Sequence, residues 1–279
     1  MITAAEEDHI VRHAYLPEHV TEYVTAISQT EPHLFGDFLV YAKEGHLIFV
    51  GYPLVETFVE NRMEQALEEA VKRLKPVSVS LLAPSIPPSL QQGSSPSTDQ
   101  YYRLELSTLS ISQKTRNMLR RAGREISLGK NLLFAQEHKK IVDEFLKSHE
   151  ADEATRFIFQ RIDAYLSSSK TASIFEARTG DGNLVAFDIA EFRPRDYAVY
   201  MFNFRSQAHY VPGASDLLLS AVLEQALSEG KTFINLGLGI NPGIAFFKEK
   251  WGGKAFLPHA FCLCNPPRKG MLEMLLQRL

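Results

Sequence analysis

A glycine-containing turn that runs directly into an apolar helix is the part of this sequence best suited to bind an anion. The run YVPGASDLLLSAVLEQAL begins at Tyr210 and carries Gly213 and Ser215 ahead of its apolar residues. Backbone N–H groups of such a turn converge on an anion, and the helix dipole adds partial positive charge at the same point. Gly213 would permit close backbone approach because it has no Cβ. An ordinary strand–turn–helix unit, in which Ser215 only caps the helix, shows the same pattern.

Carboxylates in the β-rich stretch before this turn are candidates for acid–base chemistry. Glu176, Asp188 and Glu191 lie there, and Asp188 interrupts the apolar run AFDIA. Transfer of an acyl group to an amine needs a base for the amine proton and a donor for the developing oxyanion. Asn203 lies between two phenylalanines and could hydrogen-bond a substrate amide. Each of these side chains could instead face solvent, and the aspartate could pair with an arginine.

The most charged local feature is residues 111–128, which we expect to form a basic amphipathic helix. At 100° per residue, its apolar positions share one face: Ile111, Met118, Leu119, Ala122 and Ile126. Basic residues cover the other face: Arg116, Arg120 and Arg124, with Lys114 and Arg121 beside them. Such a helix could meet phosphates, RNA or an acidic partner. It could also be a solvated helix that links two domains.

Length and charge restrict the class of protein. The 279 residues are 45% hydrophobic and carry a net charge of -3, so any anion site must be local. We expect no stable membrane insertion and a cytoplasmic location, because no apolar run reaches 18 residues and the start MITAAEEDHI is acidic. Cys262 and Cys264 cannot form a disulfide framework, and we expect buried thiols on one face of a strand and no metal site.

The first half of the chain shows β-rich runs and one clear helix. Two runs flank Lys43–His46 and predict a hairpin, and residues 58–74 predict an amphipathic helix. A buried strand is expected at 77–83 and another strand at 101–106. Residues 84–100 are rich in Pro, Ser and Gln, and predict a long exposed loop.

The second half begins a new pattern. We expect a strand at 132–136, two helical segments, and three strands at 171–179, 183–192 and 197–204 that are joined by short turns. The glycine turn, its helix, a buried strand and a second helix follow. A strand at 254–264 and a short helix at 271–279 close the chain.

This order of elements, with the glycine turn after the fourth strand, resembles the GNAT superfamily of acyl-CoA N-acyltransferases. The phosphate turn of that family reads Arg or Gln, two residues, Gly, one residue, then Gly or Ala. Tyr210, Gly213 and Ser215 occupy those positions, so the first departs from the pattern. A later family motif of Asn, Lys and Gly is matched by Asn241 and by KWG at 250–252. Lys248 stands where the family often has a tyrosine general acid.

Two further segments, FFKEKWGG and NMLRRAGRE, resemble the double-GNAT branch with the Fem-type aminoacyltransferases and the catalytic domain of lysyl-phosphatidylglycerol synthases. This resemblance implies an α/β (α+β) fold of two tandem GNAT-like units. Each unit would have a mixed, mostly antiparallel sheet flanked by helices. Residues 1–130 would form a degenerate first unit that ends in the basic helix. Residues 131–279 would form the second unit, with the cofactor turn.

The resemblance also implies site residues and ligands. Acyl-CoA, such as acetyl-CoA, would be the co-substrate, and no metal would be needed. The cofactor residues would be Tyr210, Val211, Gly213, Ala214, Ser215 and Asn241. The catalytic candidates are Asp188, Glu191, Asn203 and Lys248. The acceptor would be the amine of a small molecule or peptide.

Three functions therefore follow from the resemblance. The first is an acyl-CoA-dependent N-acyltransferase. The second keeps the fold but takes its acyl group from aminoacyl-tRNA, which could bind through the basic helix at 111–128. The third is a non-catalytic, degenerate GNAT binding protein.

Overall fold

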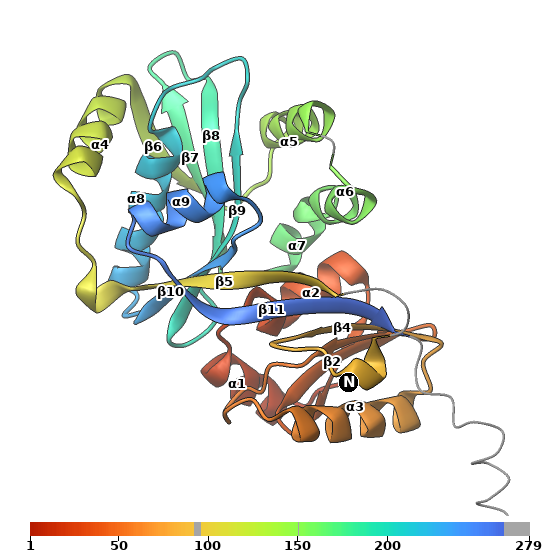
Figure 1. Cartoon of the computed structure of the whole chain (residues 1–279). Helices are drawn as coiled ribbons and strands as arrows, with labels where there is room; N and C mark the ends of the chain where they lie inside the picture. The colour runs from red at the N-terminus through yellow and green to blue at the C-terminus, as the bar shows by residue number, and fades with distance from the viewer. Residues whose placement is uncertain (92–95, 150, 265–279) are drawn as a thin grey trace, which may run out of the picture. The chain divides into compact units, whose positions relative to one another are not determined.

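The computed structural model describes residues 1–91, 96–149 and 151–264 (Figure 1). The helix expected at 271–279 lies outside this part of the chain. The described residues form two compact units, and neither is contiguous in sequence. Unit 1 comprises Met1–Thr3, Thr30–Asp99 and the chain from Leu257 onward, whereas unit 2 comprises Ala4–Gln29 and Gln100–Phe256. The sequence predicts a boundary at residue 130, between two copies of one architecture. This boundary stays a prediction.

Unit 1 is built on a sheet with strand order β1-β2-β3-β4-β11. The strands are β1 (Glu31–Phe35), β2 (Phe38–Lys43), β3 (His46–Val50), β4 (Ser78–Ala83) and the end of β11 (Lys254–Cys264). The β3–β4 pair is parallel, whereas the β1–β2, β2–β3 and β4–β11 pairs are antiparallel. Helix α3 (Glu60–Leu74) covers one face through Met63, Leu67 and Ala70. The hairpin and the amphipathic helix are thus confirmed.

The two cysteines lie on the covered face of this sheet. Cys262 and Cys264 are buried free thiols, and Leu263 between them is exposed, as the alternation predicted. Burial raises the pKa of the Cys264 thiol to about 12. The Pro/Ser-rich segment is shorter than expected, because a turn of 3-10 helix forms at Pro88–Leu90 and β5 (Ser97–Glu105) begins at Ser97.

Unit 2 is built on a sheet with strand order β5-β10-β9-β8-β7-β6. Its meander is β7 (Ala172–Thr179), β8 (Leu184–Glu191) and β9 (Tyr197–Arg205), and β10 (Phe233–Leu238) is parallel to β9. One face is covered by α4 (Gln113–Glu125) and α8 (Ala214–Ser228), with α9 (Pro242–Lys250) following β10. Figure 1 shows α4 on one side of β6–β8 and α5 on the other.

The opposite face of unit 2 is covered by short helices. These are α2 (Thr21–Ser28), α5 (Gln136–Ser148), α6 (Glu153–Phe159) and α7 (Ile162–Ser168). Two further elements come from the N-terminal segment, α1 (Ala4–His13) and the 3-10 turn η1 (Pro17–His19). None of the helices in the described ranges is long and apolar enough to cross a bilayer.

Two expected boundaries were wrong. The basic helix ends at Glu125 rather than 128, and the next strand is β6 (Ile126–Asn131) rather than 132–136. The reason is burial: Ile126 is the only fully buried residue of β6, and residues 127–130 face solvent. An edge strand of this kind lacks the apolar alternation that predicts strands.

Candidate active site

Strands β9 and β10 pair only at their beginnings. Their parallel register joins Tyr197–Val199 to Phe233–Asn235 and then stops, although β9 continues to Arg205 and β10 to Leu238. We call this point, with Tyr200–Arg205 on one side and Leu236–Leu238 on the other, the fork. Beyond Val199 and Asn235 the backbone groups of the two strands no longer pair with each other, so they need other partners.

Irregularities in both strands accompany the fork. The register of β8 against β9 shifts between Tyr200 and Phe202, and that of β5 against β10 shifts between Asn235 and Gly237. Asn235 is fully buried and holds the second irregularity, because its Oδ1 accepts the Gly237 N–H at 2.7 Å. Its Nδ2 donates to the Tyr15 carbonyl at 2.8 Å.

The glycine turn lies at the start of α8, as the sequence predicted. Gly213 is the N-cap residue, with φ of +85°. A Cβ at this position would lie 3.0 Å from Met118 Cγ and 3.4 Å from Ala122 Cβ, both on α4. The glycine is therefore required by its backbone conformation and by close contact with α4. Of the other predicted turn residues, Tyr210 is 63% exposed and Ala214 is buried.

A buried polar chain connects the meander to this turn. The Asn203 amide donates to Asp188 Oδ1 at 2.5 Å, and its Oδ1 accepts the Ser215 hydroxyl at 3.2 Å. Asp188 is fully buried, and this burial raises the pKa of its carboxyl to about 8. Hydrogen bonds from Asn203 and from the Tyr200 hydroxyl lower the pKa, whereas the charge of Asp216 raises it. At neutral pH the Asp188 carboxyl is therefore mostly protonated. The structure thus brings three of the predicted site residues together.

Glu191 lies apart from them, on the opposite face of β8. Its Oε2 accepts the hydroxyls of Tyr165 at 2.7 Å and Ser169 at 2.9 Å. Its Oε1 accepts the backbone N–H groups of Phe192 and Arg193, both at 2.9 Å. Four donors occupy this carboxylate, an arrangement that suits a structural anchor for α7 better than a base.

Lys248 on α9 places a buried cation at the fork. Its Nζ donates to the Leu238 carbonyl and lies 5.7 Å from the centre of the Tyr102 ring. The Cβ position of Gly237 would be 3.7 Å from this Nζ and 3.9 Å from the Tyr200 carbonyl oxygen. The ammonium is thus close to both strands where they separate. Asn241 is placed differently, because its Oδ1 caps α9 by accepting the Ile244 N–H at 3.0 Å.

Asp216 is a functional candidate that the sequence pattern did not reveal. It is buried in the first turn of α8, where its Oδ1 accepts the Trp251 indole N–H at 2.8 Å and pairs with Lys250 Nζ at 2.5 Å. The lysine of the later family motif therefore joins α9 to α8. An acidic residue in a helix first turn is common, so its sequence position carried no special signal.

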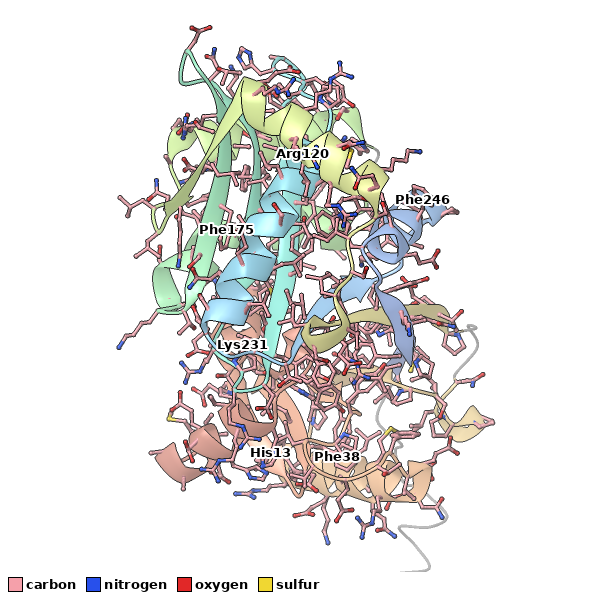
Figure 2. The ribbon with its side chains drawn as sticks, turned by 90° about the vertical axis from the view of Figure 1, so that its left-hand side faces the viewer. His13, Phe38, Arg120, Phe175, Lys231 and Phe246 are labelled. Atoms are coloured by element: carbon pink, nitrogen blue, oxygen red, sulfur yellow. The ribbon has the colours of Figure 1, made fainter. Side chains whose placement is uncertain are left out.

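Helix α4 contacts the glycine turn through Met118 and Ala122 of its apolar face, and its basic face is exposed. Arg116 is held by Gln113 and by the Ile111 carbonyl. The remaining four cations, Lys114, Arg120, Arg121 and Arg124, are exposed, and no ion pair joins them to a carboxylate in the described ranges. Figure 2 shows Arg120 on α4 beyond the upper end of α8. This surface, called the α4 basic face, is suited to a polyanion.

A cluster on the other face has the composition of a metal site. Ligand atoms of Glu137, His138 and Glu176 lie within 4.8 Å of one another. Arg178, however, pairs with both glutamates. His138 Nδ1 accepts the Ala135 N–H at 2.9 Å, which places the ring proton of the neutral form on Nε2, toward Glu176. The donor set is thus already used within the protein and fits a metal ion poorly.

A separate hollow of about 420 Å³ lies in unit 1, beside the turn between β1 and β2. Phe35 and Phe38 line it, and the ion pair of Glu56 with Arg62 lies at its wall. None of the residues predicted to bind donor or acceptor lines this hollow, so the fork and the turn remain the candidate site.

No family profile and no curated sequence matches this chain. Solved structures match it over nearly its whole length. FemX aligns with a TM-score of 0.64 and 10% identity, over 98% of this chain and 99% of that one. L-PGS from Bacillus licheniformis aligns with a TM-score of 0.58 and 15% identity, over 99% and 96%. A tandem GNAT protein from the clavulanic acid biosynthesis pathway aligns with a TM-score of 0.55 and 10% identity, over 93% of each.

The chain has the tandem GNAT fold. The expected fold class is therefore confirmed, as is the resemblance to Fem-type and lysyl-phosphatidylglycerol synthase proteins. At these identities the likeness concerns the fold alone, and function has to be argued from the site.

Proposed function

We propose that this protein transfers an acyl group to an amine at the fork. The observation that carries the proposal is the end of β9–β10 pairing at Val199 and Asn235, in the same unit as a glycine turn at the head of α8. A carbonyl held at the fork would meet the part of β9 that no longer pairs with β10, and a charged donor would lie along the turn.

An aminoacyl-tRNA is the donor that we infer from the charges of unit 2. The α4 basic face has four exposed cations without ion pairs, and α4 contacts the turn at Gly213. Cations of this kind bind nucleic acid phosphates by releasing counterions. The Fem-type proteins that this chain resembles use such donors, which is consistent with the proposal.

The leaving group supports the same donor. In an aminoacyl ester the bond that breaks joins the acyl carbon to a ribose oxygen, and the departing alkoxide needs a cation or a proton. Lys248 places an ammonium at the fork, where single-unit relatives often carry a tyrosine. We propose that Lys248 stabilises negative charge on the carbonyl or leaving oxygen, while Asp188 and Asn203 hold the turn through Ser215.

Acyl-CoA is the second candidate donor, and the turn itself favours it. Val211, Gly213, Ala214 and Ser215 would surround the pyrophosphate with Tyr210 at the rim, and thiolate departs without an acid. Pro212 cannot donate an N–H, so it would only shape the turn. Asn241 would act indirectly, as the cap of α9.

A transfer assay with two labelled donors tests the proposal. Purified protein is incubated with an amine panel and with either a mixed pool of aminoacyl-tRNA or acetyl-CoA, and amide products are measured. We expect product from aminoacyl-tRNA, and Lys248→Gln to lower kcat by about 10²-fold because one charge-stabilising group is lost. The exposed Lys170→Gln is the matched control and should retain activity.

The outcomes separate the candidates. If product forms only from acetyl-CoA, the donor is acyl-CoA rather than aminoacyl-tRNA, and the proposed acyl transfer still holds. Binding of either donor without product would identify a non-catalytic relative. Equal kcat values for Lys248→Gln and the wild type would show that Lys248 has no role in catalysis.

A further inference from the structure

The N-terminal segment brings a carboxylate to the fork that belongs to neither the meander nor the turn. The Tyr15 carbonyl accepts the amide of Asn235, the last β10 residue that pairs with β9. Two residues later the chain begins η1, which contains Glu18 and His19. A hydrogen bond to the point of strand separation thus anchors this segment.

Two tyrosines surround Glu18 from other elements, and each belongs to one side of the fork. Tyr101 on β5 is fully buried and lies opposite Leu238 on β10. Tyr23 on α2 lies 6.1 Å, ring to ring, from Phe202 on β9. Glu18 interacts with both Tyr101 and Tyr23, whose neighbours Leu238 and Phe202 belong to the two sides of the fork.

The environment of Glu18 suits proton transfer. Burial raises the pKa of its carboxyl above the ordinary range, and the Tyr101 hydroxyl opposes part of that rise. The Oε2 oxygen is covered, whereas the residue as a whole is partly exposed. A base with a raised pKa is matched to amine chemistry near neutral pH.

Lys248 and Tyr101, the partner of Glu18, both neighbour Leu238 of β10. Lys248 donates to the Leu238 carbonyl and lies over the ring of Tyr102. Tyr101, the residue before Tyr102, points to the other face because side chains alternate along a strand. An acyl carbonyl at the fork would therefore have a cation on one side and a carboxylate on the other.

We propose that Glu18 is the catalytic base that removes a proton from the acceptor amine. This inference rests on the proposed function. As the amine nitrogen forms a bond to the acyl carbon, its proton moves to Glu18. The bond from the acyl carbon to the leaving oxygen breaks, and that oxygen takes a proton from solvent or from Glu18. One amide and one hydroxyl form, and the carboxylate is regenerated. The acceptor would thus enter from the η1 and α2 side.

The test compares pH–rate profiles of full-length variants with the best donor and amine from the transfer assay. We expect Glu18→Gln to lower kcat at least 100-fold, to leave donor binding unchanged, and to lose the acidic limb of the profile. Glu18→Asp should retain more activity than Glu18→Gln. The exposed Glu224→Gln on α8 is the control and should match the wild type.

The Tyr101→Phe variant gives a second test, because the acidic limb of its pH–rate profile would not shift if Glu18 had only a structural role. The Tyr101 hydroxyl lowers the pKa of Glu18, so its removal should shift the acidic limb to higher pH while a lower plateau of activity persists. If the acidic limb of the Tyr101→Phe profile lies at the same pH as in the wild type, the assignment is overturned. A Glu18→Gln variant with normal kcat would also overturn it.

Failure of this inference is distinguishable from failure of the proposed function. A wild-type protein that transfers acyl groups while Glu18→Gln is equally active overturns only the role of Glu18. A wild-type protein that is inactive with every donor and amine overturns both.

Discussion

Asp188 and Glu191 show how strand alternation divides candidate residues between two sites. They are three positions apart on β8, and an odd spacing places side chains on opposite faces. Asp188 meets Asn203 below the glycine turn, whereas Glu191 meets Tyr165 of α7. Sequence alone could have separated the two carboxylates by this rule. It could not supply their partners, because the register of β8 against β9 is set by distant contacts.

The raised pKa of Asp188 predicts a pH-dependent stability. Between about pH 4 and pH 8 the unfolded chain releases a proton that folded Asp188 keeps, so the free energy of unfolding falls as pH rises. The slope for one such group is about 1.4 kcal/mol per pH unit. The Asn side chain of Asp188→Asn does not titrate and can still accept the hydrogen bond from Asn203. As pH rises, the free energy of unfolding of the variant minus that of the wild type should therefore increase by this slope. Urea unfolding at pH 5, 6 and 7.5 measures it. A difference that is constant with pH would contradict the prediction.

At the scale of elements, the contact between α4 and α8 depends on Gly213. Gly213→Ala adds a Cβ in a left-handed conformation and 3.0 Å from Met118. Gly182→Ala is a matched control, with φ of +83° and no atom within 4 Å of the added Cβ. We expect Gly182→Ala to cost about 1 kcal/mol and Gly213→Ala to cost at least about 1 kcal/mol more, because overpacking adds to backbone strain. If urea unfolding shows that the two variants lose the same free energy of unfolding, α4 accommodates the added Cβ without further destabilisation.

The α4 basic face predicts salt-dependent RNA binding. The triple variant Arg120→Ala, Arg121→Ala and Arg124→Ala removes exposed cations and leaves the apolar side of α4 unchanged. Its affinity for tRNA should fall at least tenfold near 0.1 M salt, and its slope of log K against log salt should decrease by about 2 to 3. Lys140→Ala with Lys147→Ala removes two exposed cations from α5 as the control. Unchanged binding by the triple variant would exclude this surface.

Elements with strong periodicity were predictable, and the relations between elements were not. The helix at 58–74 and the three strands of the meander form close to their expected limits, because local apolar patterns determine them. Residues 126–131 form an edge strand with one buried side chain, and no pattern marked it. Glu18 was missed for a related reason, because a glutamate in a first helical turn is ordinary and its meeting with Tyr101 spans 83 residues of sequence.

At the scale of the whole molecule, the two units interrupt each other in sequence. Ala4–Gln29 belongs with Gln100–Phe256, although Thr30–Asp99 lies between them. Ion pairs of Arg193 with Glu7 and Glu22 and the bond from Asn235 to Tyr15 hold the first segment. The predicted division at residue 130 concerns two copies of one architecture and stays a prediction.

This exchange has a consequence for synthesis on the ribosome. The segment with Tyr15 and Glu18 is translated about 180 to 220 residues before its partners on β9 and β10. Its apolar side chains must therefore stay exposed, or be sheltered by chaperones, until those partners are made. A gene fragment that begins at residue 100 would encode every strand of the meander and the fork, yet it would lack the chain that closes them.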